Sequence, residues 1–491
     1  DHPSALGQDY RFHYDNGDAL VDCPTSYGCA YRRGRLARVE VEHAPGTFWS
    51  LYYDYVEDGG VGSEQWPDTQ ETIYEYDALG RLARSHFPAR AGDSLRYQYD
   101  ANPGDAQDAT EVVKIVHERV GSGDVLHWAR AIQRDALNRV SAVTTEDQGL
   151  SQVVYRPDGR LQCFWVYRRS GSPQVGVVDR CYGFSTDGTL TGHDSLVAGD
   201  AARTFRYDQG NRLTCATSVQ GSATCPTAAP LIQSYTYDGS DNRTQMRSPA
   251  GTTGYLLSGN TIYDEYPPGR TLWYAYQAGP GGPRVWDYEL SGPGNNDRTF
   301  TYDGDGRLST VGLWRADAPA APTRHHTIAI VYDHRSRPLV VTDHNDTTAF
   351  ESRWQYFWDL EDRLSNVIHV PDASDPTHYV TDSYAPIEPL LVGRNRAEFW
   401  SWGGSETFLY YATGPEGLPA AAYVFTPGTT STTQVWRAQW GPFGNLLSET
   451  GSPATYAAPF RFQGQLGLPG SAATWWSGST LVTSREQVVL N

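Results

Sequence analysis

The sequence is poor in the patterns that build helices or cross membranes. It has one methionine in 491 residues, and no long stretch carries apolar residues at helical spacing. No run of 18 apolar residues occurs, so the sequence predicts no membrane-spanning helix. The start, Asp1-His2-Pro3, lacks the charged and apolar regions of a signal peptide. We therefore expect either that a leader was removed or that the chain is a processed fragment of a longer one.

Positive charge is also scarce. Lysine and arginine together number 39 against 57 aspartates and glutamates, which gives a net charge of −18. Phosphate contacts need a basic surface, so this balance argues against a nucleic-acid partner and against anionic membranes. We predict no nucleic acid and no membrane insertion, and we interpret the excess acid as a source of solubility.

Short motifs of catalytic and cofactor sites are absent as well. The sequence has no Gly-x-Ser-x-Gly elbow, no phosphate loop, no dinucleotide fingerprint and no Cys-x-x-Cys pair. Asp303 to Arg307 begins like a calcium loop, but Arg307 stands where a further oxygen ligand is needed, which favours a plain turn. His325 and His326 adjoin on an expected strand and point to opposite faces. We predict no catalytic, cofactor-binding or metal residues, and no enzyme.

Strand-forming and turn-forming residues dominate what is present. Aromatic residues make up 13% of the chain, including 32 tyrosines, beside 49 glycines and 30 prolines. Aromatic side chains favour strands, whereas glycine and proline favour turns. This composition predicts an all-β protein with almost no helix.

The stretch Tyr74 to Leu82 shows how the chain is built. Tyr74 and Tyr76 alternate with a polar residue, so both rings lie on one face of a strand. Asp77 to Gly80 is turn chemistry, because the carboxylate accepts from backbone N–H groups two residues on and Gly80 tolerates a positive φ. Arg81-Leu82 begins the return strand. The unit is a hairpin that opens with Tyr-Asp and resumes with Arg-Leu.

This hairpin unit recurs along the chain. Tyr207 to Leu213 and Tyr302 to Leu308 repeat it, and looser copies occur around Asp135, Asp333 and Asp359. The aspartates of neighbouring copies lie 23 residues apart (77 to 100), 30 apart (208 to 238) and 26 apart (333 to 359). A period of this size indicates a repeat architecture, in which each unit packs mainly on its neighbours.

We expect structural roles for the residues of the three best copies. The aspartates hold the turns, and the arginines pack on ring faces or pair with carboxylates. The predicted turn residues are Tyr76, Asp77, Gly80, Arg81, Tyr207, Asp208, Arg212, Tyr302, Asp303, Gly306 and Arg307. Each hairpin has one aromatic face that it cannot bury alone, so the units must pair edge to edge. The result is a continuous spiralling antiparallel sheet, forming an elongated or hollow shell whose closure hides strand edges.

The six cysteines fall into three local pairs. These are Cys23 with Cys29, Cys163 with Cys181, and Cys215 with Cys225. Local disulfides that close loops or hairpins fit an oxidising compartment and predict an extracellular or cell-surface protein. The alternative is six buried free thiols in a cytosolic protein. Six cysteines allow 15 connectivities, so this pairing is a hypothesis.

The C-terminal part changes pattern from about Thr407. It carries Tyr411 to Ala420, then Val435 to Asn445 with a Gly-Pro-Phe-Gly segment, and then Arg461-Phe462-Gln463-Gly464-Gln465. Together with the Tyr-Asp…Gly-Arg-Leu units, these segments resemble the Rhs/YD-repeat family over nearly the whole chain. The family's conserved core continues further, whereas Leu466 to Asn491 matches it only at Thr474-Trp475-Trp476.

The resemblance implies a function as well as a fold. Family members form a hollow shell around a C-terminal toxin, in bacterial polymorphic toxins, insecticidal toxin complexes and teneurins. We therefore expect residues 1–406 to be a repeat spiral and residues 407–491 a truncated C-terminal core segment. The expected role is a non-enzymatic shell or scaffold of an exported protein. Its expected partners are a C-terminal toxin domain or another shell component. Alternatives are an extracellular carbohydrate-binding or adhesion module, which would partner glycans, and a self-assembling surface fibre, which would be a homo-oligomer.

Overall fold

The structure is a computed structural model, and it describes most of the chain. The described residues are 10–14, 34–44, 46–67, 70–88, 92–99, 111–119, 125–146, 149–169, 174–195, 197, 202–219, 224–227, 231–249, 251–258, 261–266, 271–279, 282–291, 298–303, 307–315, 323–346, 348, 350–360, 362–375, 378–387, 390–400, 403–413, 419–425, 432–440, 442, 446–452, 466–467 and 489–490.

Nine strands at the N-terminal end form one antiparallel sheet in sequence order. They are β1 (Tyr10–Tyr14), β2 (Leu36–Ala44), β3 (Thr47–Tyr55), β4 (Val61–Gln65), β5 (Glu71–Tyr76), β6 (Leu82–His86), β7 (Ser94–Gln98), β8 (Lys114–Glu118) and β9 (Val125–Ala129).

A second antiparallel sheet of 26 strands follows, again in sequence order. Its first part is β10 (Ala131–Arg134), β11 (Val140–Thr144), β12 (Leu150–Tyr155), β13 (Leu161–Arg169), β14 (Gln174–Phe184), β15 (Leu190–Asp194), β16 (Arg203–Tyr207), β17 (Leu213–Thr217), β18 (Leu231–Tyr237), β19 (Arg243–Ser248), β20 (Gly251–Ser258), β21 (Thr261–Tyr266), β22 (Thr271–Gly279), β23 (Gly282–Ser291), β24 (Arg298–Tyr302) and β25 (Leu308–Arg315).

The rest of this sheet runs to the C-terminal region. It comprises β26 (Thr323–Tyr332), β27 (Pro338–Asn345), β28 (Glu351–Trp358), β29 (Leu364–Val370), β30 (Tyr379–Ile387), β31 (Leu390–Trp400), β32 (Gly403–Thr413), β33 (Pro419–Phe425), β34 (Thr432–Trp440) and β35 (Leu446–Gly451). A separate pair joins β36 (Leu466–Gly467) to β37 (Val489–Leu490). No α-helix occurs among the described residues.

The two large sheets share one strand at Arg130. The backbone N–H of Ile132 still bonds to the carbonyl of Val113, in the segment before β8, at 2.8 Å. The N–H of Arg130 already bonds to the carbonyl of Thr144 in β11 at 2.7 Å. β9 and β10 are therefore two halves of one strand that changes partner at a bend, and the sheet continues across it.

The strands follow the alternation expected from the sequence. In β18, Leu231, Gln233 and Tyr235 are buried, while the residues between them are only partly buried. This period of two gives every strand one face for packing. Polar members such as Gln233 are paired when buried: the Tyr235 hydroxyl donates to Gln233 Oε1 at 2.7 Å.

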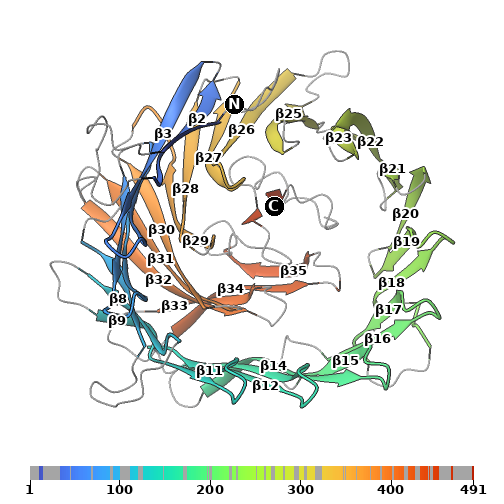
Figure 1. Cartoon of the computed structure of the whole chain (residues 1–491). Coiled ribbons are helices and arrows are strands. Elements are labelled where there is room, and N and C mark those ends of the chain that lie inside the picture. The colour runs from blue at the N-terminus through green and yellow to red at the C-terminus, as the bar shows by residue number, and fades with distance from the viewer. Residues whose placement is uncertain are drawn as a thin grey trace.

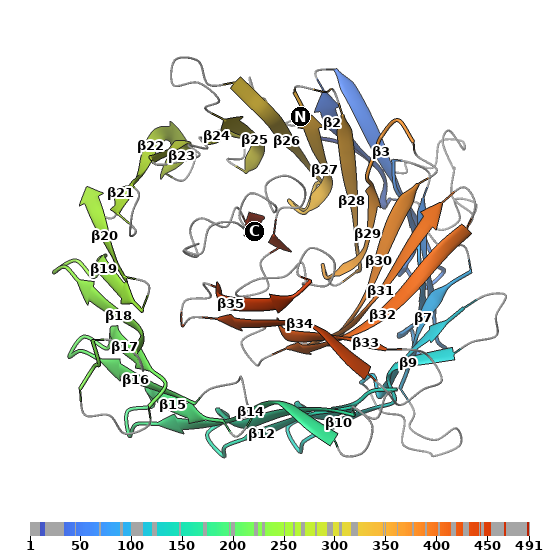
Figure 2. The same ribbon diagram turned by 180° about the vertical axis from the view of Figure 1, so that it is seen from behind.

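The sheet curls into a ring that overlaps itself. Figures 1 and 2 show the strands passing once around a central space, after which β26 to β33 run inside the first strands of the chain. We call this contact, between the outer strands β1–β14 and the inner strands β26–β33, the overlap seam. In both views the C-terminal strands β34 to β37 lie toward the centre of the ring.

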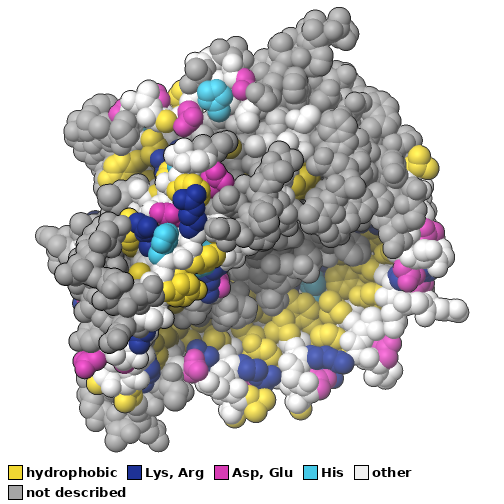
Figure 3. All heavy atoms as spheres, turned by 45° about the horizontal axis from the view of Figure 1, so that its top comes forward, with side chains coloured by type: hydrophobic (Ala, Val, Ile, Leu, Met, Phe, Trp, Pro, Cys, Tyr) yellow, Lys and Arg dark blue, Asp and Glu magenta, His cyan; other side chains and the backbone are white. Residues whose placement is uncertain are grey.

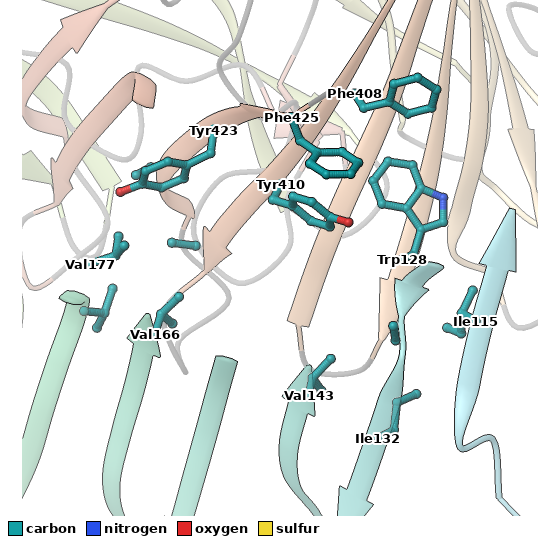
Figure 4. Close-up of a cluster of buried hydrophobic side chains, with 14 of the residues drawn as sticks. Ile115, Trp128, Ile132, Val143, Val166, Val177, Phe408, Tyr410, Tyr423 and Phe425 are labelled. Atoms are coloured by element: carbon teal, nitrogen blue, oxygen red, sulfur yellow. The ribbon is translucent and has the colours of Figure 1, made fainter. Parts of the chain in front are cut away.

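The main hydrophobic cores lie in the overlap seam. One joins Tyr10, Val39, Leu51 and Trp66 of the outer layer to Leu339, Val340 and Phe357 of the inner layer. A larger one joins Trp128, Ile132, Phe164 and Val177 to Phe408, Tyr410 and Phe425. Figure 4 shows Trp128, Ile132 and Val177 of the outer strands facing Phe408, Tyr410 and Phe425 of β32 and β33.

These observations confirm the expected fold class, an all-β spiral that closes into a hollow shell. The space-filling view shows a hollowed face, with hydrophobic side chains along the lower wall of the recess (Figure 3). The 26-stranded sheet also runs without a break in strand order through position 407, from β31 to β34.

Candidate functional site

The repeat turns are the first feature that the sequence singled out, and Asp77 organises one of them. Its Oδ1 accepts from the backbone N–H groups of Leu79 and Arg81, both at 2.9 Å. Its Oδ2 accepts from Arg81 Nε at 2.7 Å. Gly80 has a φ of 74°, in the left-handed region that glycine adopts without strain. One side chain therefore fixes the turn at three points.

The other two predicted copies have the same geometry where the structure describes them. Asp208 accepts from the N–H groups of Gly210 and Arg212 at 2.9 and 3.0 Å and from Arg212 Nε at 2.7 Å. The backbone bond from Arg212, together with its guanidinium, holds the pKa of Asp208 below its usual value. Asp303 accepts from the N–H and Nε of Arg307 at 2.8 and 2.7 Å. Gly306 lies outside the described residues.

Tyrosines that precede these aspartates lie at β-bulges. The register of each hairpin shifts by one residue at Tyr76, Tyr207 and Tyr302. A bulge bends and twists the strand locally, which suits a sheet that must curl. The hydroxyl of Tyr76 also donates to the carbonyl of Val61 in β4 at 2.8 Å.

Each arginine connects its own turn to the next unit. The Arg81 guanidinium lies 4.3 Å from the ring centroid of Tyr99, and Arg307 lies 4.8 Å from that of Tyr332. The same tyrosine hydroxyls donate back to the residue after each arginine: Tyr99 to Leu82 at 2.9 Å and Tyr332 to Leu308 at 2.8 Å. Arg212 Nη1 reaches Asp238 and Asp241 of the following turn at 3.0 and 2.7 Å. The turns thus form a chain of contacts along one rim of the sheet.

Polar groups cross the overlap seam beside the two cores. The Tyr10 hydroxyl donates to the carbonyls of Tyr332 and Asp333 at 3.2 and 3.0 Å. Arg119 pairs with Glu406 at 2.5 Å. Arg168 is almost fully buried, donates to Tyr411 at 3.3 Å and lies 5.1 Å from the ring of Tyr410. These contacts fix the outer layer's position on the inner one.

A buried carboxyl lies within the seam. Glu64 in β4 is 8% exposed, and the Tyr74 hydroxyl donates to its Oε2 at 3.1 Å. Burial raises the pKa of Glu64 to about 7, against the opposing effects of Arg337 and the Tyr74 hydrogen bond. No sequence motif marks this residue, because its burial depends on the strands that pack over β4.

Two of the expected disulfides are formed. Cys163 and Cys181 are directly opposite each other on β13 and β14, and Cys215 joins Cys225 in the loop after β17. Cys23 and Cys29 lie outside the described residues. The side chain of His326 shares a hydrogen bond with Asp343 at 2.9 Å, and the side chain of His325 is not described. Within the described part of the chain, no group of three or more His, Cys, Asp or Glu side chains gathers as metal ligands do.

No protein-family model matches this sequence, and no curated protein matches it. Solved structures do. The chain is similar to a chain of the Tc holotoxin pore of Photorhabdus luminescens, with a TM-score of 0.63 and 14% identity, over 94% of this chain and 24% of that one. It matches a crystal structure of TcdB2-TccC3 with a TM-score of 0.62 and 15% identity, over 94% of this chain and 25% of that one.

The same complex without its hypervariable C-terminal region gives a TM-score of 0.62 at 15% identity, over 94% of this chain and 24% of that one. The chain therefore spans about a quarter of the length of the solved chains it matches. These structures share the fold of this chain, and that fold agrees with the one that the resemblance of the hairpin units implied. Among the residues that the structure describes, no helix is long and apolar enough to cross a membrane.

Proposed function

We propose that this chain is a wall section of a closed β-shell that encloses a polypeptide in an exported, toxin-associated assembly. The observation that carries this proposal is the overlap seam, where two sheet layers bury two hydrophobic cores between them beside the central space. A ring that served only as a binding surface would not need to bury its own outer strands against its inner ones.

The similar structures support the toxin association. One is a Tc holotoxin pore by name, and one TcdB2-TccC3 structure is distinguished by lacking a hypervariable C-terminal region. In this chain, the strands beyond β33 turn toward the ring centre (Figures 1 and 2). We propose that residues 407–491 lead from the wall into the enclosed space, so that a segment joined there would lie inside.

The wall itself acts without catalysis in this proposal. The residues that the repeats single out are used in turns, bulges and ring contacts, as Asp77, Arg81 and Tyr99 illustrate. Export to an extracellular or cell-surface location fits the disulfides of β13, β14 and the loop after β17. The two alternative functions, glycan binding and fibre assembly, are supported only by the aromatic composition and the repeats of the sequence.

Protease protection tests the proposal on the full natural gene product. We expect any segment joined to the C-terminal end to resist proteinase K in the native protein and to be digested once the shell is unfolded. Trp128→Ala, which weakens the seam, should shorten that protection, whereas Leu137→Ala, at a side chain 70% exposed on a turn, should not. Digestion of the segment at equal rates in native and unfolded protein would refute enclosure.

A further inference from the structure

The overlap seam is closed differently from the rest of the wall. Every backbone ladder of the described strands joins consecutive strands, so the outer and inner layers meet through side chains and a few side-chain-to-backbone bonds. Separating the layers therefore breaks no strand pairing. Opening elsewhere in the ring would expose the N–H and C=O groups of two strand edges. The seam is therefore a line along which the shell can open without breaking a backbone ladder.

Glu64 lies at the seam where the first strands cover a repeat turn. On its own sheet it is paired in register with Tyr53 of β3 and Thr72 of β5. Across the seam lies the turn from Asp333 to Arg337, in which Asp333 is fully buried and Arg337 is 8% exposed. Trp66, two residues after Glu64, packs edge-on against Phe357 with ring centroids 4.9 Å apart.

Arg337 is the cation that most favours an ionised Glu64, and it already has two carboxylate partners. Arg337 donates from Nε to Asp333 at 2.7 Å and from Nη1 to Asp362 at 2.7 Å. Glu64 itself is hydrogen-bonded to a neutral phenol, that of Tyr74. An ionised Glu64 would add a third carboxylate to a buried site whose arginine is shared, and a buried charge without its own partner is costly.

The surrounding groups come from both layers. The outer layer contributes the Glu64, Tyr53, Tyr74 and Tyr10 side chains, and the inner layer contributes Asp333, His334, Arg335, Arg337, Asp359 and Asp362. Asp333 disfavours an ionised Glu64, while Arg337 and Arg335 favour it. His334 contacts the rings of Phe12 and Tyr53, and burial lowers its pKa.

We propose that the overlap seam is a pH-responsive closure, in which β4 packs over the Asp333–Arg337 turn while the Glu64 carboxyl is uncharged, and ionisation of that carboxyl weakens the packing. The consequence for an enclosed polypeptide, easier release at neutral to alkaline pH, rests on the proposed function. The closure itself does not, because its measurement needs no cargo.

The direction follows from the two states of Glu64. Its pKa is about 7 in the closed seam and 4.5 when exposed, so its contribution to closure is fully present below pH 4.5 and is lost as pH rises through 7. His334 acts in the opposite direction, because a neutral buried imidazole resists protonation as pH falls through its usual value of 6.5. Comparing wild type with a variant at Glu64, both at the same pH, removes the His334 effect.

Amide hydrogen exchange of the seam peptides tests the proposal in this chain and in Glu64→Gln. The ratio of wild-type to variant opening constants, read from peptides covering β4, β5 and the turn at 333–337, should rise on the order of 50-fold between pH 5 and pH 8.5. Peptides from β16 and β17, which lie outside the seam, should show no such divergence. Glu57→Gln, at an exposed residue of the turn between β3 and β4, is the matched control and should leave the pH profile unchanged.

Equal seam protection in wild type and Glu64→Gln at every pH, or a ratio that falls with pH, would overturn the proposal. If the variant does not fold, the wild type decides: its seam peptides must exchange about 2-fold faster relative to β16 and β17 as pH rises from 7 to 8.5, and constant relative rates would overturn it. If seam exchange does not change with pH but the C-terminal segment is still protected from protease, the pH closure is rejected and the proposed enclosure is not. If seam exchange changes with pH as expected but the segment is not protected, enclosure is rejected and the pH closure is not.

Discussion

Two copies of the same turn should differ in what their aspartates contribute, because only one of them is buried in the seam. Asp333 and Asp77 make matching bonds: each accepts two backbone N–H groups at 2.9 Å and an arginine Nε at 2.7 Å. The side chains of Asp333 and Arg337 are 0% and 9% exposed, against 24% and 22% for Asp77 and Arg81. The sequence places Asp77 in one of the three best copies and Asp333 in a looser one, so it does not mark Asp333 as the more important of the two.

The expected magnitudes follow from that difference in burial. Asp333→Ala leaves the Arg337 guanidinium short of its main partner inside the seam, and breaking a buried ion pair in this way costs about 3–5 kcal/mol. Asp77→Ala loses the same bonds where water can replace them, so we expect about 1 kcal/mol. Asp333→Asn keeps the shape but not the charge, and it should fall between the two.

Native-state hydrogen exchange measures these losses locally, which suits a repeat protein that does not unfold in one step. The free energy of opening should be read at the turn amides of 333–337 and of 77–81 in each variant. Equal losses at the two turns, or a larger loss for Asp77→Ala, would refute the argument that seam burial sets the importance of a repeat turn.

Further predictions test the seam and the disulfides. Trp128→Ala removes a side chain that is 1% exposed and contacts Phe408 and Tyr410. In exchange experiments it should lower the opening free energy of the seam peptides by about 3–5 kcal/mol and leave that of β18 unchanged. An equal loss in both would contradict a local seam. Arg81→Lys should lower the opening free energy of the turn at 77–81 by about 1 kcal/mol, since lysine cannot bond Asp77 and lie flat on Tyr99 together. Alkylation under denaturing conditions without reductant should leave Cys163, Cys181, Cys215 and Cys225 unmodified by mass; labelling of all six cysteines would end the extracellular hypothesis.

The hairpin units could be predicted from sequence because their information is local. Tyr76, Asp77, Gly80 and Arg81 lie within six residues, and turn chemistry connects them directly. The bulge at each tyrosine and the contact from Arg81 to Tyr99 were not predicted, because they depend on the register between neighbouring strands and hairpins.

The seam could not be predicted because its contacts join distant units. Tyr10 bonds to Tyr332 across 322 residues, and no alternation pattern says which repeat will lie beneath β1. In the sequence, Glu64 is an ordinary polar residue of a strand, and its burial follows only from the turn at 333–337 that lies across the seam. The partner of His326 also depends on strand pairing, because β27 runs beside β26 and brings Asp343 to it.

The most direct test of the shell is a cryo-electron microscopy map of the full natural gene product. The account predicts a closed ring in which β1–β14 overlap β26–β33, with polypeptide density inside the ring that continues from the C-terminal strands. A ring that is open at the seam, or a closed ring whose C-terminal continuation lies outside it, would contradict the central claim.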